Sequence, residues 1–298
     1  LEKLGVKFKF KENYLKAEVI NQDKILLGST IKFKCKSVGA TETLIMAASL
    51  AKGLTILKNA SQEPEIIDLA NLLNKMGAKI KGAGSEFITI EGVKSLKGCD
   101  FTVMPDRIEA GTYLIAAAMN RSKISFSSIE PNHLKEVINK LEQSGCNFEY
   151  SRKSLKIIPN EILNSVNITT NPYPGFPTDL QAPFMALMTT ANGVSIIKET
   201  VFENRMHHVK ELIRMGAKIT LTKNTARVVG VKQLKGSSLI GYDLRGTAAL
   251  VIAGLSAKGN SIIQGLEYLN RGYENFTFKL KKIGANIKNK ENKINTKI

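Results

Sequence analysis

Hydrophobic and polar positions along the chain repeat with a period close to 70 residues. The segments LLNKMGAKI, KLEQSGCNF, LIRMGAKIT and KLKKIGANI place Gly77, Gly145, Gly216 and Gly284 at intervals of 68, 71 and 68 residues, and Gly5 precedes Gly77 by 72. Each glycine follows an amphipathic helical pattern and precedes a stretch in which apolar and polar residues alternate, as in a strand. We therefore predict that each of these glycines is the C-terminal cap of a helix.

A second helical pattern lies upstream of each amphipathic one and consists mostly of small apolar residues. The four examples are ATETLIMAASLAKG, AGTYLIAAAMN, DLQAPFMALMTTANG and GTAALVIAGLSAKG. Because these segments are apolar nearly all round, we predict that they are buried beneath the charged helix of the same repeat. The sequence thus predicts an α+β (α/β) fold with four complete βαβαββ units and the remnant of a fifth.

The repeats fall into two groups that meet at the junction KSLKGCDFTVMP. We expect the remnant and the first complete unit to form a partial lobe at residues 1–103, and the other three units to form a second lobe at residues 104–298. The junction contains no flexible linker, so the lobes should be directly hinged. A cleft between two such lobes is a natural ligand site.

Composition narrows the class of protein. Hydrophobic residues make up 43% of the 298 positions without a run long enough to span a bilayer, which predicts a soluble protein with no membrane partner. The net charge of +17 suggests nucleic-acid binding, but 35 Lys outnumber 8 Arg, are spread along the chain and have no Trp beside them, so no nucleic-acid partner is expected. The three cysteines show neither metal-ligand spacing nor a disulfide framework, which favours a reducing cytoplasm and no bound metal.

The stretch NPYPGFPTDLQA leads through three prolines to Asp179, at the start of an apolar run. Proline fixes φ and lacks a backbone donor, so the approach is stiff. One interpretation is that Thr178 and Asp179 cap the helix that follows. The other is that the stiff approach positions a reactive carboxylate. The stretch by itself favours capping.

Several segments taken together resemble a known family. KSVGATET, MPDRIEAGTYLIAAA, YPGFPTDLQAPF, ETVFENRMHHVKELIRMGAKI, DLRGTAALVIAGL and NRGYENFTFKLKKIGANI occur in order and are similar to signature segments of the UDP-N-acetylglucosamine 1-carboxyvinyltransferases. The resemblance implies a two-lobed inverse α/β prism. It also implies a reaction that needs no cofactor, in which the enolpyruvyl group of phosphoenolpyruvate is transferred to the 3-hydroxyl of UDP-N-acetylglucosamine. In the family this reaction is the first step of peptidoglycan precursor synthesis in the cytoplasm.

The resemblance assigns catalytic roles to three residues. Asp179 matches the aspartate that contacts the sugar 3-hydroxyl, where a general base must lie within hydrogen-bond reach. Arg245 and Arg271 match arginines that hold the anionic substrate, to which a guanidinium presents a planar fork of donors. The alternative for the two arginines is a structural ion pair, for example with Asp243 or Glu274.

The resemblance also assigns substrate-binding roles. Arg205 matches a further cleft arginine, and Val201 matches a branched residue whose backbone reaches the acetylated sugar. A loop that grips the nucleotide through backbone N–H groups and a hydroxyl matches Cys35, Lys36, Ser37, Val38 and Gly39. Cys35 departs from the family pattern, because many members carry lysine there, and this puts one phosphate contact in doubt.

The remaining reactive side chains are predicted to be structural. Cys35 is placed in a strand, Cys99 in the junction and Cys146 just beyond a helix cap, all as inert thiols. His207 and His208 are predicted to be surface or packing residues, and a role as catalytic acids is the alternative.

The family carries further functional residues upstream of the matched part, namely a Lys-Asn pair, an arginine and a loop with a reactive cysteine. The sequence contains none of them, so we expect the 298-residue chain alone to be inactive. Two alternatives stay open, an enzyme like 3-phosphoshikimate 1-carboxyvinyltransferase and a non-catalytic binding paralogue. Retention of the aspartate and the three arginines disfavours the paralogue.

Overall fold

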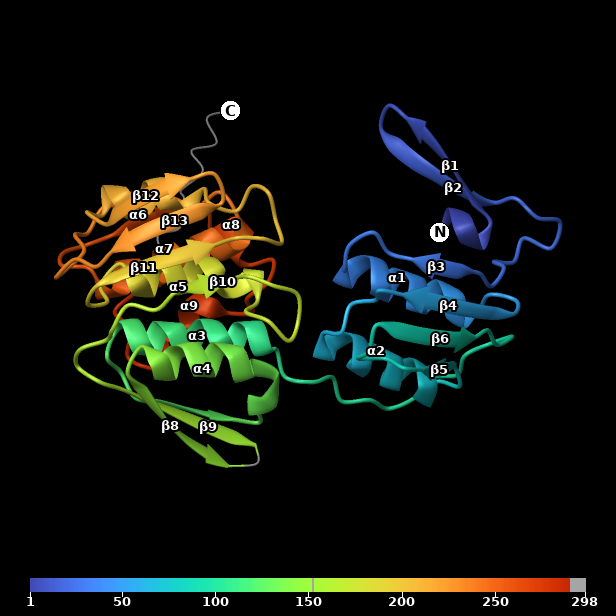
Figure 1. The fold of residues 1–298 in the computed structure, drawn as a ribbon, viewed down its shortest axis with the longest axis horizontal. Coiled ribbons are helices and arrows are strands. Elements are labelled where there is room, and N and C mark those ends of the chain that lie inside the picture. Colours follow the sequence, from blue (N-terminus) through green and yellow to red (C-terminus); the bar gives the residue numbers. More distant parts are fainter. Residues whose placement is uncertain (152, 290–298) are drawn as a thin grey trace, which may run out of the picture. The chain divides into compact units, whose positions relative to one another are not determined.

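The computed structural model describes residues 1–151 and 153–289, and the chain divides into two compact units (Figure 1). One unit contains Leu1–Met104 with Pro172–Pro174, and the other contains Pro105–Asn171 with Gly175–Ile298. Each unit has its own hydrophobic core. The sequence predicts something different, namely two lobes of an inverse α/β prism at residues 1–103 and 104–298. That division into lobes stays a prediction.

The first unit contains a hairpin and one complete repeat. The hairpin strands β1 (Val6–Lys11) and β2 (Tyr14–Val19) are antiparallel and follow the 3-10 helix η1 (Glu2–Leu4). The repeat has a sheet of order β3-β4-β6-β5, in which only β3 and β4 are parallel. Its elements are β3 (Thr30–Lys32), α1 (Val38–Ser49), β4 (Leu54–Lys58), α2 (Pro64–Lys75), β5 (Lys79–Lys81) and β6 (Phe87–Glu91).

The second unit contains a repeat with the same topology. Its sheet has the order β10-β11-β13-β12, again with a single parallel pair between the first two strands. Its elements are β10 (Ile168–Thr169), the 3-10 helix η3 (Thr178–Leu180), α5 (Gln181–Met188), β11 (Val194–Lys198), α6 (His208–Arg214), β12 (Lys218–Thr222) and β13 (Thr225–Val229). The identical strand order confirms the βαβαββ repeat inferred from the glycine spacing.

Two further repeats of the second unit lack strands among the described residues. The first comprises α3 (Arg107–Met119), β7 (Ile124–Ser127), η2 (Pro131–Leu134), α4 (Lys135–Gln143), β8 (Cys146–Ser151) and β9 (Ser154–Pro159). The second comprises β14 (Ser238–Ile240), α7 (Leu244–Ser256), β15 (Ile262–Gln264), α8 (Leu266–Leu269) and α9 (Phe276–Lys282). Residues 101–104 form no strand because they have no ladder partner there. The strand pair predicted beyond Gly284 extends into residues 290–298, outside the described part.

The five periodic glycines all adopt a left-handed backbone conformation. Their φ values are 95° at Gly5, 106° at Gly77, 103° at Gly145, 92° at Gly216 and 100° at Gly284. Glycine is favoured there because it has no Cβ to clash at positive φ. The predicted C-terminal caps are therefore confirmed.

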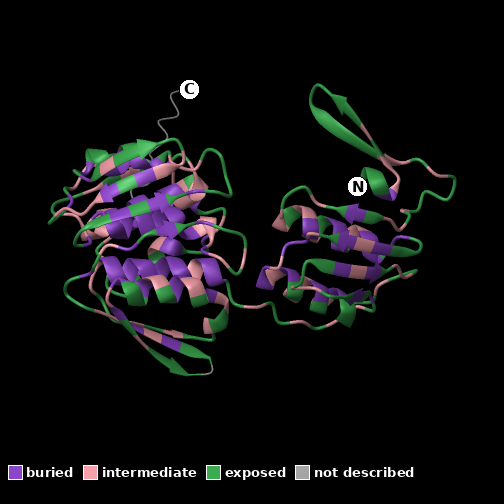
Figure 2. Cartoon of the chain, viewed as in Figure 1, coloured by how far each residue is buried: buried purple, intermediate pink, exposed green. Residues whose placement is uncertain are grey.

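Three helices of small apolar residues form the centre of the second unit. All eight residues of α5 are buried, and α3 and α7 are buried over most of their length (Figure 2). The three helices pack against one another in all pairs. Alanine and glycine allow this close approach, so the prediction of buried helices holds for this unit.

Helix α1 differs from its three counterparts, although its sequence is of the same type. Leu44 and Ile45 are buried against the first unit's core, but Met46 and Leu50 are 49% and 48% exposed. The helix thus buries one face and leaves another apolar face uncovered. None of the helices in the described part of the chain is long and apolar enough to cross a membrane.

Candidate active site

Asp179 lies in η3, directly before the buried helix α5. Neither Thr178 nor Asp179 makes a side-chain cap hydrogen bond to η3 or α5. The capping interpretation of the sequence is therefore wrong, because the carboxylate is engaged elsewhere. Its partners are arginines from two other segments.

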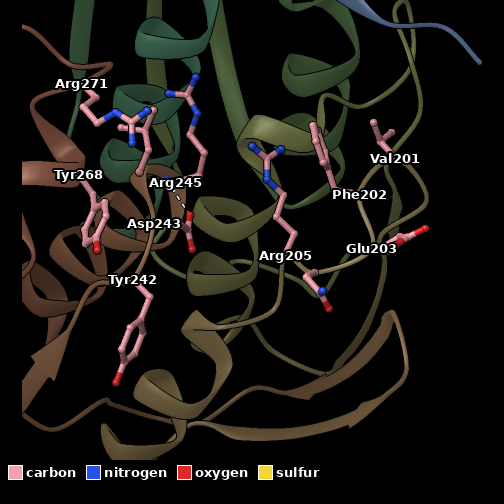
Figure 3. Close-up of a pocket in the computed structure, with 11 residues that line it drawn as sticks. Val201, Phe202, Glu203, Arg205, Tyr242, Asp243, Arg245, Tyr268 and Arg271 are labelled. Atoms are coloured by element: carbon pink, nitrogen blue, oxygen red, sulfur yellow. Dashed lines mark hydrogen bonds between the residues drawn. The ribbon is translucent and has the colours of Figure 1, made fainter. Parts of the chain in front are cut away.

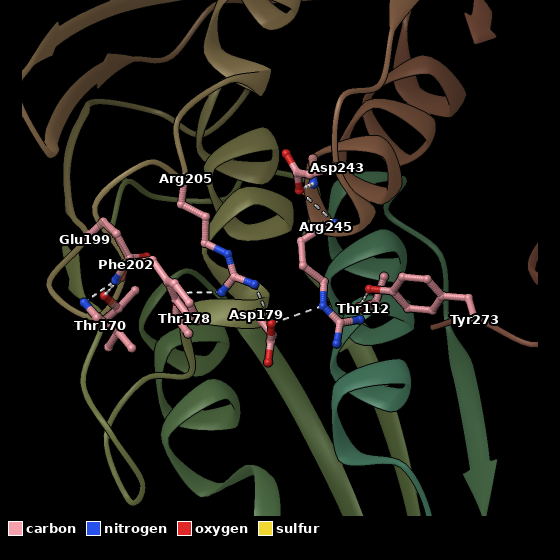
Figure 4. Close-up of polar contacts among 12 residues, drawn as sticks. Thr112, Thr170, Thr178, Asp179, Glu199, Phe202, Arg205, Asp243, Arg245 and Tyr273 are labelled. Carbon is pink, nitrogen blue, oxygen red and sulfur yellow. Dashed lines mark hydrogen bonds and ion pairs between the residues drawn. The ribbon is translucent and has the colours of Figure 1, made fainter. Parts of the chain in front are cut away.

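Two guanidinium groups converge on a single oxygen of the Asp179 carboxylate (Figure 4). Oδ1 accepts a hydrogen bond from Arg205 Nη2 at 2.7 Å and another from Arg245 Nε at 3.1 Å. Oδ2 has no hydrogen-bond partner among the described residues, and the side chain is 33% exposed. One carboxylate oxygen is thus held in place while the other stays available.

The charges around Asp179 control its protonation. Burial raises the pKa of the Asp179 carboxyl, but the charges and hydrogen bonds of Arg245 and Arg205 outweigh burial and bring the pKa below its usual value. Burial lowers the pKa of the Arg245 guanidinium, whereas Tyr273 and Asp179 raise it by more. The site therefore holds one anion and two cations at neutral pH.

Arg245 is held from several sides at the start of α7. Asp243 caps this helix by accepting from the backbone N–H of Arg245 and Gly246, so Asp243 and the Arg245 side chain do not form the predicted alternative ion pair. The guanidinium carbon lies 5.2 Å from the centre of the Tyr273 ring. Nη1 is buried without a hydrogen-bond partner among the described residues, a costly arrangement that an anionic ligand would relieve.

A pocket of about 790 Å³ in the second unit contains four of the sequence-predicted residues (Figure 3). Arg271 is exposed, and no ion pair joins it to Glu274 or to any other described carboxylate. The lining residues are Val201, Phe202, Glu203, Asn204, Arg205, Tyr242, Asp243, Leu244, Arg245, Tyr268 and Arg271. Three arginines on one pocket make it suited to a polyanionic ligand.

The predicted nucleotide-binding loop lies in the first unit, at the start of α1. Ser37 caps the helix by accepting from the Ala40 N–H at 3.3 Å, and Val38 and Gly39 form the first turn. Lys36 Nζ is 2.9 Å from Glu86 Oε1 and donates to Gln62 at 2.9 Å. The positive charge of Lys36 is therefore partly neutralised by Glu86 within the first unit.

Cys35 is not in a strand, contrary to prediction. Strand β3 ends at Lys32, because its parallel partner β4 ends at Lys58 and the chain then turns at Asn59 with a φ of 58°. Cys35 is exposed in the bend that follows. A strand pattern in the sequence continues only as long as a neighbouring strand is present to pair with it.

The other cysteines and the histidines occupy structural positions. Cys146 is buried at the start of β8, and burial raises the pKa of its thiol to about 11, so it stays protonated. Cys99 is half-buried in the junction. His207 is exposed, whereas His208 is buried with both ring nitrogens unpartnered among the described residues. The prediction of surface and packing roles agrees with these positions.

Several residues of the site escaped sequence reasoning. Tyr242, Tyr268 and Phe202 line the pocket, Tyr273 lies beside Arg245, and Glu199 is buried near Arg205. The aromatic residues are ordinary in type, with no spacing that marks them. The one available signal was their position, since Glu199, Phe202 and Tyr273 fall within segments that carry the arginines and Tyr242 and Tyr268 lie one or two positions before such segments.

Repeated βαβαββ units with buried central helices define an α/β class of protein, and here they place an arginine-flanked carboxylate beside a cation-lined pocket. A solved structure of this architecture, the enolpyruvyl transferase NikO from Streptomyces tendae, matches with a TM-score of 0.86 and 25% identity, over 96% of this chain and 70% of that one. An EPSP synthase from Acinetobacter baumannii shares the fold, with a TM-score of 0.69 and 19% identity over 90% of this chain and 64% of that one. The chain belongs to the EPSP synthase (3-phosphoshikimate 1-carboxyvinyltransferase) family, whose model matches residues 1–280.

Curated relatives within the family are more similar still. The chain is 59% identical over 287 residues to UDP-N-acetylglucosamine 1-carboxyvinyltransferase 2 of Prochlorococcus marinus. The aligned region covers 96% of this chain and 67% of that protein. It is 56% identical to UDP-N-acetylglucosamine 1-carboxyvinyltransferase from another strain of that organism, over 97% of this chain and 63% of the relative. The chain thus spans about two thirds of the length of these relatives.

Proposed function

We propose that the protein transfers the enolpyruvyl group of phosphoenolpyruvate to the 3-hydroxyl of UDP-N-acetylglucosamine and releases phosphate. The observation that carries the proposal is the asymmetry of Asp179, whose Oδ1 accepts from two arginines while Oδ2 has no hydrogen-bond partner in the described part of the chain. The names of relatives with 59% and 56% identity support the choice of substrates. We further propose that the reaction serves peptidoglycan precursor synthesis in the cytoplasm.

The chemistry requires a base for the sugar hydroxyl. In the addition step, the hydroxyl oxygen bonds to C2 of phosphoenolpyruvate, Asp179 Oδ2 accepts the hydroxyl proton, and C3 gains a proton from an acid. In the elimination step, C3 loses a proton to a base, and the bond between C2 and the phosphate oxygen breaks with its electron pair leaving on phosphate. The products are the enol ether of the sugar nucleotide and inorganic phosphate. Asp179 has the free oxygen that the first step needs.

The arginines supply the positive charge that the two anionic substrates need. Arg271 has no carboxylate partner among the described residues, and Arg245 has a buried guanidinium nitrogen without an acceptor. Both arginines therefore have guanidinium nitrogens that can donate to a carboxylate or phosphate without breaking an existing hydrogen bond. Arg205 is held on Asp179, and we assign it to fixing the base. In the first unit, Cys35–Gly39 are proposed to hold the nucleotide.

The test compares Asp179→Asn with the parent protein, each joined to the N-terminal third of a Prochlorococcus relative. We expect phosphate release from phosphoenolpyruvate that depends on UDP-N-acetylglucosamine, and we expect Asp179→Asn to lower kcat by about 100-fold or more, because a general base contributes ~10²–10⁴-fold. Binding of the nucleotide sugar should change much less. The coupled phosphate assay and calorimetric titration measure these two quantities.

Two outcomes would contradict the proposal. Near-parental turnover of Asp179→Asn would remove Asp179 as the base. Phosphate release that depends on shikimate 3-phosphate instead of the nucleotide sugar would establish the alternative substrate. The unfused 298-residue chain, expected to be inactive, is the control that shows what the joined segment contributes.

A further inference from the structure

Glu199 is a buried carboxylate for which the proposed chemistry has no direct use. It follows strand β11 and is 1% exposed. No ion pair compensates its charge among the described residues, and a buried carboxylate is costly unless hydrogen bonds satisfy both oxygens. Glu199 meets this requirement through four donors.

The four donors divide unequally between the two carboxylate oxygens (Figure 4). Oε1 accepts from Thr170 Oγ1 at 2.7 Å, from the Val201 N–H at 2.8 Å and from the Phe202 N–H at 3.1 Å. Oε2 accepts only from Thr178 Oγ1, at 2.9 Å. The contacts of Oε1 hold the backbone of the pocket loop at Val201 and Phe202. The contact of Oε2 with Thr178 connects Glu199 to Arg205, which in turn contacts Asp179.

The contact through Thr178 ends at Arg205. Arg205 Nη1 donates to Thr178 Oγ1 at 2.7 Å, while Nη2 of the same guanidinium donates to Asp179. Because a guanidinium only donates, Thr178 must accept from it and can direct its single proton only towards Glu199. The direction of every proton from Arg205 through Thr178 to Glu199 is therefore fixed.

The same inventory of protons requires Glu199 to be the acceptor at both oxygens. Backbone N–H groups occupy Oε1, and Thr170 Oγ1 already accepts from the Thr200 N–H, so its proton points to Glu199. A proton on Oε2 would point at Thr178 and leave the Thr178 hydroxyl proton without an acceptor. Both oxygens of Glu199 therefore act as hydrogen-bond acceptors.

We propose that Glu199 is a positioning residue for the transfer reaction. Through Thr178 it orients the guanidinium of Arg205 on Asp179 Oδ1, and through the amides of Val201 and Phe202 it holds the loop that lines the pocket. The catalytic part of this inference rests on the proposed function. The structural part concerns the protein whatever its substrate.

The chain offers a matched pair of variants for the test. Thr178→Val and Thr170→Val each remove one hydroxyl donor from Glu199, but only Thr178 also contacts Arg205. We expect Thr178→Val to lower kcat/KM by about 10- to 100-fold, as for loss of a hydrogen bond to a charged group. Thr178→Ser, which keeps the hydroxyl, should restore most of the activity.

A double-mutant cycle with Arg205→Ala separates positioning from general destabilisation. In the Arg205→Ala background, Thr178→Val should cause almost no further loss of kcat/KM, because the residue through which it acts is gone. Thr170→Val should cause the same loss in both backgrounds. Additive effects of Thr178→Val and Arg205→Ala would overturn the proposal.

A second measurement does not depend on activity. Glu199→Ala removes the acceptor of both amides, so amide hydrogen exchange at Val201 and Phe202 should quicken at least tenfold, equivalent to the loss of about one hydrogen bond. Amides of β13, in the same unit, should keep their parental exchange. Unchanged exchange at Val201 and Phe202 would overturn the inference. If no transfer activity were found, the exchange measurement would still test whether Glu199 holds the pocket loop.

Discussion

As the proposed base, Asp179 must satisfy two demands that oppose each other. To accept a proton it must be ionised, and Arg245 and Arg205 ensure this by lowering the pKa of its carboxyl. A lower pKa also makes the carboxylate a weaker base, and general bases work best when their pKa lies near the working pH. An anionic substrate bound at the unpartnered nitrogen of Arg245 would offset part of the arginine charge, weaken this stabilisation and raise the basicity of Asp179.

His208 presents the reverse case, a buried base that stays uncharged. Burial lowers its pKa to about 4, with Asp243 opposing this effect and His207 and Arg205 adding to it. An unfolded histidine has a pKa near 6.5 and binds a proton first as the pH falls. The unfolded state is then favoured, so stability is lost between pH 6.5 and about 4 and levels off below.

We predict that His208→Leu removes this part of the pH dependence. The loss in the parent protein is on the order of 3 kcal/mol, since each pKa unit corresponds to ~1.4 kcal/mol. Urea denaturation at a series of pH values measures it. His207→Gln changes an exposed neighbour and should keep the parental slope. An unchanged slope in His208→Leu would show that other groups cause it.

At the scale of elements, close helix packing depends on small residues. A Cβ added at Gly111 in α3 would lie 2.4 Å from Leu180 Cδ1 and 3.3 Å from Leu134 Cδ2. Leu180 comes directly before α5, so this glycine determines how closely the two helices approach.

We predict that Gly111→Ala destabilises the protein by about 1–3 kcal/mol, because overpacking outweighs the better helix propensity of alanine. Thermal unfolding followed by circular dichroism measures the change. Gly39→Ala in α1 is the control, since an added Cβ there meets nothing within 4 Å, and it should be neutral or slightly stabilising. Equal effects of the two variants would contradict the packing argument.

Sequence reasoning succeeded where the signal was local and failed where it was not. The glycine caps and the helices α3, α5 and α7 follow from composition and period over a few turns. The contact of Glu199 with Thr178 joins two common residues that only the fold brings together. Cys35 was misplaced because the end of β3 depends on the end of its partner β4.

At the scale of the whole molecule, the apolar face of α1 affects the behaviour of the chain in solution. Met46 lies in α1 and Leu50 directly follows its last residue, four positions further on, so the two side chains lie on the same side. Exposed apolar patches of this kind promote association. The net charge of +17 opposes association, but salt screens that repulsion.

We predict that the 298-residue chain associates at high salt and that the double variant Met46→Gln, Leu50→Gln does so much less. Sedimentation velocity at low and high salt gives the association state. Ile162→Gln, which changes a residue 70% exposed in the second unit, is the control and should behave like the parent. Equal association of the double variant and the parent would exclude the α1 face as the cause.

The left-handed glycines at the helix ends have a consequence for chirality. At Gly77 and Gly216 a Cβ of the natural hand would meet no atom within 4 Å, yet φ is 106° and 92°. Space is available there, so the handedness of the amino acid is what excludes other residues. A D-alanine, for which positive φ is the ordinary range, should fit these positions as well as glycine, which fits them because it is achiral.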